Sequence, residues 1–96
     1  MKYILDEQGE PVATENLEAW AMWFESSDRT VRKTVIGEVE VSTVFLSLDH
    51  RFGGEGPPIL WETMIFGGEH DEFTDRYTSR VDAIAGHEAA VKRLQA

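Results

Sequence analysis

The chain has no cysteine, few basic residues and no long apolar run. Without cysteine it cannot form disulfide bonds, thiolate zinc sites or cysteine nucleophiles, which agrees with the cytosol. No apolar stretch approaches the roughly 20 residues of a membrane-spanning helix. The opening residues hold one lysine and a short apolar run, so we expect no signal peptide there. These absences predict a soluble, cytoplasmic protein without a membrane partner.

Basic residues are scarce: nine Lys and Arg stand against 18 Asp and Glu, which gives a formal net charge of −9. Binding to a nucleic-acid backbone requires a basic face, so we expect no nucleic-acid partner. Anionic membrane surfaces are disfavoured for the same reason. Solubility is the simplest interpretation of the acidity, and mimicry of an acidic partner such as DNA is an alternative.

Motifs that name a reaction are also missing. No serine lies in a Gly-x-Ser-x-Gly elbow, and the sequence contains no Walker A loop or dinucleotide-binding fingerprint. The three histidines and the carboxylates show no His-Glu-x-x-His pair or similar diagnostic spacing. We therefore predict no metal site and no cofactor from spacing alone, and the sequence names no activity.

The composition does predict a core. Apolar residues make up 42% of the 96 residues and ten residues are aromatic, which argues against disorder and predicts a single domain over residues 1–96. A chain this short is marginally stable unless it is helped, for example by a partner subunit. Three tryptophans exceed what one small core needs, so we expect aromatic surface in a groove or shared with a second copy. A homo-oligomer is therefore predicted.

Residues 39–68 organise the chain. Two β-branched apolar runs, Val39–Leu48 and Ile59–Phe66, flank a loop rich in glycine, proline and charge, and both are predicted strands. Further strands are predicted over Lys2–Leu5 and Val31–Ile36. The intervening Gly37-Glu38 predicts a type II′ hairpin turn that pairs Ile36 with Val39 and Thr34 with Val41.

Two amphipathic helices complete the pattern. The first is predicted over about residues 15–26, with Thr14 as its N-cap. The second is predicted over about residues 80–94, with Ser79 and Asp82 as a capping box. The order β-α-β-β-β-α, with short connections, predicts an α+β fold: a small two-layer sandwich with an antiparallel sheet of about four strands and both helices on one face.

Several segments form a pattern that covers nearly the whole chain. They are Tyr3-Ile4-Leu5-Asp6, Val41-Ser42-Thr43-Val44-Phe45-Leu46, Leu48-Asp49-His50, Phe52-Gly53, Glu62-Thr63-Met64, Phe66-Gly67-Gly68, Arg76-Tyr77-Thr78 and Ala85-Gly86-His87. In these segments the chain resembles a family of small uncharacterised proteins of tailed bacteriophages and prophages. The resemblance implies expression inside a bacterial cell. It implies no established activity, so it assigns no catalytic residue, although small phage proteins often act on host machinery or host defence.

Two single residues could carry chemistry. Glu62 lies within an apolar strand, where a carboxylate must be paired, hydrogen-bonded or protonated. It could be a general base, a metal ligand or a ligand anchor, or it could pair with an arginine. His87 lies on the apolar side of the last helix. It could be a hydrogen-bonded core histidine, or it could reach toward Glu62 or a ligand.

Polar clusters end both central strands and could bind a ligand. If the ligand is small, we expect an anionic, nucleotide-like molecule held by arginines, glycine amides and a stacked aromatic ring. The residues predicted for this site are Asp49, His50, Arg51, Phe52, Gly53, Gly54, Trp61, Glu62, Gly67, Gly68, His70, Arg76, Tyr77 and Arg80. Because the strands are antiparallel, the clusters that include Asp49 and His70 are expected at opposite ends of the sheet, unless dimerisation or a bent strand joins them.

Three functions stay open on the sequence alone. The first is a non-enzymatic binding module that sequesters a small anionic ligand or a host protein to counter host defence. The second is a small acid–base or metal-dependent hydrolase that uses Glu62 and a histidine such as His87. The third is a protein-interaction or virion-associated protein whose polar residues are only structural.

Overall fold

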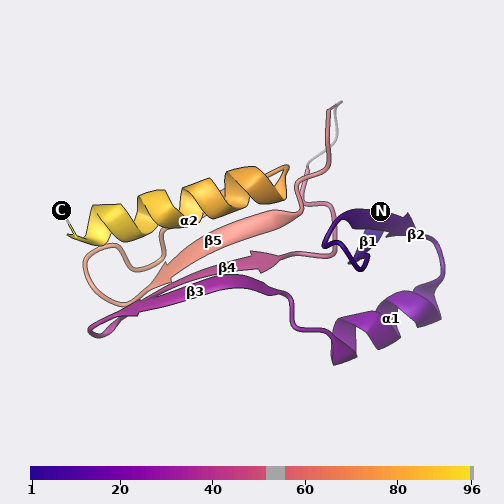
Figure 1. The fold of residues 1–96 in the computed structure, drawn as a ribbon, viewed down its shortest axis with the longest axis horizontal. Helices are drawn as coiled ribbons and strands as arrows, with labels where there is room; N and C mark the ends of the chain where they lie inside the picture. Colours follow the sequence, from indigo (N-terminus) through magenta and orange to yellow (C-terminus); the bar gives the residue numbers. More distant parts are fainter. Residues whose placement is uncertain (52–55, 96) are drawn as a thin grey trace.

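The structure is a computed structural model that describes residues 1–51 and 56–95 (Figure 1). Its elements, in chain order, are β1 (Lys2–Leu5), β2 (Pro11–Thr14), α1 (Leu17–Ser26), β3 (Thr30–Ile36), β4 (Val39–Phe45), β5 (Trp61–Phe66), β6 (Thr74–Tyr77) and α2 (Arg80–Gln95). Three of the predicted ligand residues, Phe52, Gly53 and Gly54, lie outside the described residues.

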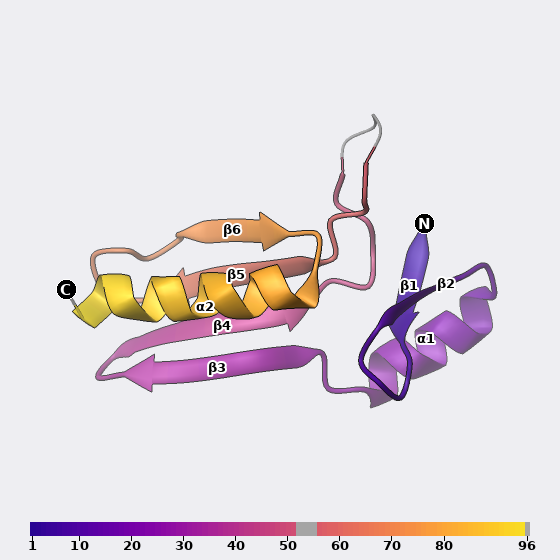
Figure 2. The ribbon, with the colours of Figure 1, turned by 45° about the horizontal axis from the view of Figure 1, so that its top comes forward.

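The strands form two antiparallel sheets. β3, β4, β5 and β6 make a four-stranded sheet in that order, and β1 and β2 make a separate two-stranded ribbon. α2 lies along one face of the four-stranded sheet, whereas α1 packs on β1 beyond the end of that sheet (Figures 1 and 2). The predicted α+β class, with a four-stranded antiparallel sheet and two helices, is confirmed.

The β3–β4 hairpin has the predicted register. Ile36 pairs with Val39, and Thr34 pairs with Val41, across the two turn residues Gly37 and Glu38. Gly37 has a φ of +61°, which suits the first central position of a type II′ turn and which glycine adopts without steric cost. The turn thus fixes the register, and the register determines which side chains of the two strands share a face.

The predicted element order misses two strands. Pro11–Thr14 forms β2 on β1, and Thr74–Tyr77, predicted to be a connector, forms β6 on β5. Each strand has only four residues, too few for an alternating pattern to stand out, and each takes its extended geometry from the strand beside it. The observed order is β-β-α-β-β-β-β-α.

α1 differs from the prediction in its start and in its place. Asn16 is the N-cap, and its side-chain oxygen accepts a hydrogen bond from the amide of Ala19 at 3.0 Å. Asparagine caps helices better than threonine, and the predicted cap, Thr14, ends β2 instead. α1 does not cover the four-stranded sheet; its Trp23 packs edge-on against Phe45 at the end of β4, with ring centroids 5.8 Å apart.

α2 begins as predicted and packs closely on the sheet. The Ser79 hydroxyl accepts a hydrogen bond from the amide of Asp82 at 3.1 Å, which is one half of the predicted capping box. Gly86 lies against the ring of Tyr77 from β6, and a Cβ at this position would overlap that ring. The small residue therefore sets how closely the helix approaches the sheet. Neither helix, as far as the chain is described, is long and apolar enough to cross a membrane.

The core consists of two buried clusters under α2. One contains Phe45, Leu60, Trp61 and Ala83, and the other contains Val41, Ile65 and Ala90. The first lies at the end of the sheet that adjoins the N-terminal unit, which we define as residues 1–28, and Tyr3, Leu5 and Trp23 pack against it. The N-terminal unit is thus attached to the sheet through one end of the core.

Candidate functional site

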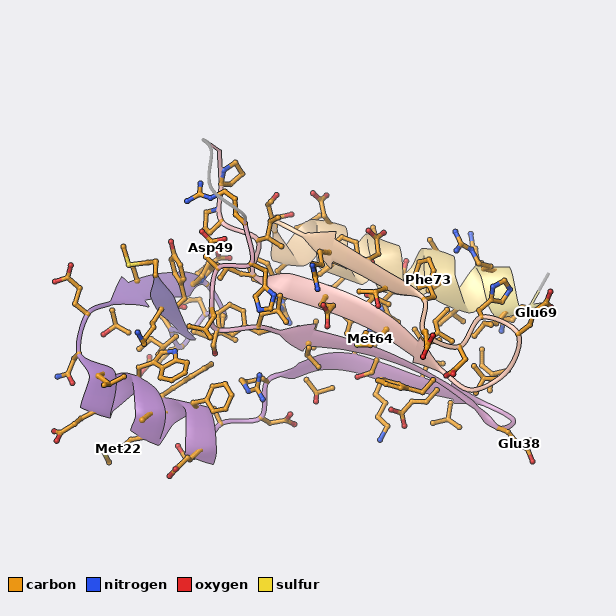
Figure 3. The ribbon with its side chains drawn as sticks, turned by 180° about the vertical axis from the view of Figure 1, so that it is seen from behind. Met22, Glu38, Asp49, Met64, Glu69 and Phe73 are labelled. Carbon is orange, nitrogen blue, oxygen red and sulfur yellow. The ribbon has the colours of Figure 1, made fainter. Side chains whose placement is uncertain are left out.

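The four-stranded sheet has one face under α2 and a second face that neither helix covers (Figures 1 and 3). Thr34 and Thr43 point toward α2, because both bond to His87. Successive side chains of a strand point to opposite faces, so the residues next to each threonine point away from α2. We call this second face the open face. The strand register places on it Lys33, Val35, Glu40, Ser42, Val44, Glu62, Met64, Phe66, Thr74 and Arg76. Figure 3 shows Met64 on this side of the sheet, away from α2.

The open face combines apolar side chains with two ion pairs. Val35 is 62% exposed and Phe66 is 46% exposed. Lys33 pairs with Glu40 at 3.2 Å across β3 and β4. Glu40 and Ser42, at alternate positions of β4, are the sequence signal for this surface, because they indicate that one face of the strand is not fully buried.

Glu62 pairs with Arg76 on the open face. The Arg76 Nε donates a hydrogen bond to the Glu62 Oε2 at 2.9 Å across β5 and β6. The Glu62 side chain is 12% exposed in this arrangement. Of the environments predicted for Glu62, the structure shows the internal pair with an arginine.

His87 lies between α2 and the sheet, buried, with both ring nitrogens bonded. Its Nε2 is 2.8 Å from the Thr34 hydroxyl, and its Nδ1 is 2.8 Å from the Thr43 hydroxyl. The Thr43 hydroxyl also bonds to that of Thr63, so the network joins β3, β4 and β5 to α2. Burial lowers the pKa of His87, and the positive charge of Arg32 lowers it further, while Glu88 opposes them. His87 is thus the hydrogen-bonded core histidine, held in its neutral form.

Glu62 and His87 cannot act on one substrate within a single copy. Glu62 directly precedes Thr63, whose hydroxyl belongs to the network around His87. Adjacent residues of a strand point to opposite faces, so the carboxylate lies on the open face and the imidazole lies under α2. The geometry therefore separates the two groups that the hydrolase hypothesis requires side by side.

Asp49 holds its own loop together. Its Oδ1 accepts hydrogen bonds from the amides of Arg51 and Ile59, both at 2.9 Å, and its Oδ2 pairs with the Arg51 guanidinium at 3.2 Å. Burial raises the pKa of Asp49, but these amides, Arg51 and the N-terminal ammonium together hold it below its usual value. The carboxylate is therefore ionised and fully engaged in closing the loop between β4 and β5.

Gly67 and Gly68 form a tight turn against the β3–β4 hairpin. Their φ angles are +91° and +72°, and a Cβ on Gly67 would come within 2.9 Å of the Glu38 carbonyl oxygen. The Gly67 amide donates to the carboxylate of Asp71 at 2.7 Å. These glycines are explained by the turn and by this close approach, and the Gly67 amide is already used.

The predicted ligand residues do not converge in one copy. The Asp49 loop and the turn that contains Glu69 lie at opposite ends of the four-stranded sheet, as predicted (Figure 3). Trp61 is buried in the core, and Tyr77 lies against α2, where burial raises the pKa of its hydroxyl. Arg80 lies beside Gly9 in the turn between β1 and β2. His50 and His70 are half-buried next to Asp49 and Asp71 respectively, so they too lie at separate ends.

Most cationic side chains already have partners. Four of the nine pair with carboxylates: Arg32, Lys33, Arg51 and Arg76. Three more lie over aromatic rings: Lys2, Arg29 and Arg93. In the part of the chain that the structure describes, three or more His, Asp or Glu side chains do not gather as a metal site would require, and no pocket is found.

The negative charge is concentrated in the N-terminal unit. Residues 1–28 hold seven carboxylates and one lysine, a net −6, while residues 29–96 hold 11 carboxylates and eight cations, a net −3. Within this unit, Glu18, Met22 and Glu25 follow i, i+4, i+7 spacing and are all exposed, Met22 to 72%. Figure 3 shows Met22 pointing away from the rest of the molecule. We call these three residues the acidic face of α1.

Similarity to known proteins adds nothing to this geometry. Comparison with protein-family models, with curated proteins and with solved structures finds no match for the chain.

Proposed function

We propose that this chain is a non-enzymatic binding module that acts in the bacterial cytoplasm on a host protein with a basic surface. The observation that carries the proposal is the charge of the N-terminal unit, which holds net −6 of the total −9 in 28 of the 96 residues. This unit projects from the end of the sheet (Figure 1). The residues on the acidic face of α1 are exposed.

Charge and apolar contact support a protein partner. Carboxylates at Glu18 and Glu25 flank Met22, so a basic surface would gain both ion pairs and apolar burial on docking. α1 buries none of its own residues completely, and the three residues of its acidic face are all exposed. An anionic small molecule is less well matched, because seven of the nine cations are engaged within the chain.

Two further observations support binding rather than catalysis. The candidate acid and base, Glu62 and His87, lie on opposite faces of the sheet, and each is already bonded to other side chains. The resemblance to small phage proteins supports a place inside a bacterial cell, with interference in host machinery or host defence as the effect.

The test compares two charge reversals of equal size. Glu18→Lys with Glu25→Lys changes the acidic face of α1, and Glu38→Lys with Glu69→Lys makes the same change in net charge at the far end of the molecule (Figure 3). The tagged variants are used to capture proteins from bacterial cells, and a captured protein is then purified and titrated. We expect the α1 variant to weaken binding at least about tenfold and to flatten its salt dependence, with less than about a twofold change in the control.

Two results would contradict the proposal. An equal loss in both variants would mean that net charge alone attracts the partner. Undiminished binding by the α1 variant would place the partner on another surface.

A further inference from the structure

We infer that the open face is the interface of a homodimer, in which the sheets of two copies pack face to face. This inference does not depend on the proposed function, because the open face and the acidic face of α1 share no residue. A face-to-face pair with twofold symmetry is isologous, so the same residues of each copy would meet.

The open face carries exposed apolar side chains. Val35 and Phe66 are 62% and 46% exposed on either side of Glu40, and Met64 and Val44 lie half-buried further along the two central strands. Clustered apolar side chains on an otherwise polar surface are typical of protein interfaces. Aromatic and methionine side chains are enriched in such interfaces, so Phe66 and Met64 are suitable anchors.

The open face is electrically neutral in an acidic protein. Two copies of a chain with net charge −9 repel one another over most of their surface. On the open face, however, Lys33 and Arg76 balance Glu40 and Glu62 within two ion pairs, so this face is neutral. A second copy of the same acidic protein can therefore approach it without like-charge repulsion, whereas a strongly basic partner would be drawn to the N-terminal unit instead.

The chain exposes more surface than a compact monomer of its size. Its accessible surface is 6319 Å², while a compact monomer of 10.9 kDa exposes about 5,600 Å². The excess of roughly 700 Å² is spread over the whole molecule, including the projecting N-terminal unit, and it is surface that association with a second copy can cover in part. The radius of gyration agrees: it is 14.3 Å, against about 12.5 Å for a compact domain of this length.

The sheet edges are protected against the alternative mode of pairing. β3 carries Arg32 and Lys33 next to each other, and its register shifts between Thr30 and Arg32. Lysine and local irregularity on an edge strand oppose edge-to-edge pairing, and β6, the other edge, has only four residues. The face is therefore the better surface for self-association.

The test measures the mass in solution of the wild type and of three variants. Light scattering and sedimentation are recorded across a concentration series. Wild type is expected at twice the 10.9 kDa chain mass. Phe66→Lys and Val35→Lys, on the open face, are each expected to raise the dimer dissociation constant at least about 30-fold. Val81→Lys, at a 76% exposed position on α2, is the matched control and should remain a dimer.

The choice of lysine makes this test specific. Each substitution reduces the net negative charge by one, so a general electrostatic effect would strengthen association rather than weaken it. Val35 is the more exposed of the two face positions, so V35K decides the question if F66K folds poorly. A monomeric wild type at about 100 μM would overturn the inference, since a standard interface binds well below that concentration. A dimer that survives both face variants would overturn it as well.

Discussion

The two faces of the four-stranded sheet are built from the same strands and differ in almost every physical respect. Toward α2, side chains such as Val41, Phe45 and Ile65 are completely buried, and the polar groups around His87 are hydrogen-bonded to one another. On the open face, Phe66 remains half-exposed and the four charged side chains form two ion pairs at the border with water. The face under α2 therefore stabilises the fold, while the open face is available for contact with another molecule.

The largest expected effect contrasts one residue type on the two faces. Phe45→Ala should lower the free energy of unfolding by about 3–5 kcal/mol, because it leaves a cavity among Trp23, Trp61 and the rest of the core. Phe66→Ala should cost less than about 1 kcal/mol in dilute protein, because its ring is half-exposed. Urea unfolding measures both, and an equal cost at the two positions would contradict the division between the faces.

A second prediction concerns how closely α2 approaches its face. Gly86→Ala places a methyl group where the Tyr77 ring lies, and we expect a loss of about 1–3 kcal/mol although alanine favours helices. In a Tyr77→Ala background the same substitution should be neutral or stabilising by up to ~1 kcal/mol. The double-mutant cycle, measured by thermal and urea unfolding, separates the clash from helix propensity. Additive effects would mean that the ring and the helix are not in contact.

Features set by a few neighbouring residues could be predicted from the sequence. The hairpin at Gly37 and the cap at Ser79 depend on local backbone geometry, and both were predicted correctly. β6 and the role of Gly86 could not be predicted, because each depends on a contact with another element, β5 for β6 and the Tyr77 ring for Gly86. The same holds for α1, whose apolar face predicts a helix but does not reveal which surface it packs on.

The candidate site shows the same limit. The pattern around Glu62 predicts a partner for the carboxylate and does not identify Arg76, which comes from the strand that the sequence analysis missed. The sequence predicts a ligand contact for Asp49, whereas its carboxylate accepts hydrogen bonds from two amides of its own loop. These bonds depend on how the loop closes, which the sequence does not show. Polar residues beside a glycine-rich loop are therefore ambiguous until their backbone contacts are known.

The third prediction tests the neutral histidine under α2 through pH. The pKa of His87 is lower in the folded state than the usual value of about 6.5, so the unfolded chain binds the proton more tightly. Stability should be unaffected by this group above about pH 7 and should fall as the pH drops below about 6.5, by up to ~1.4 kcal/mol per pH unit.

A variant isolates this contribution from the other titrating groups. His87→Gln should be less stable than wild type at pH 7.5, because the amide does not reproduce both hydrogen bonds of the imidazole, to Thr34 and to Thr43. Its unfolding free energy should then be flatter between pH 7 and pH 5. Parallel pH profiles for the two proteins would show that His87 is not the group that titrates.

The smallest expected effect is on the open face. Glu62→Gln should change the free energy of unfolding by less than about 1 kcal/mol, because its ion pair with Arg76 lies at the border with solvent. Arg76→Gln should cost a similar amount, and the double variant no more than either alone. Partner binding through α1 should stay within about twofold of wild type, because Glu62 lies outside that surface. If the chain were a hydrolase that used Glu62 as its acid or base, Glu62→Gln would keep the fold and abolish the activity. This variant therefore distinguishes a structural ion pair from a catalytic carboxylate.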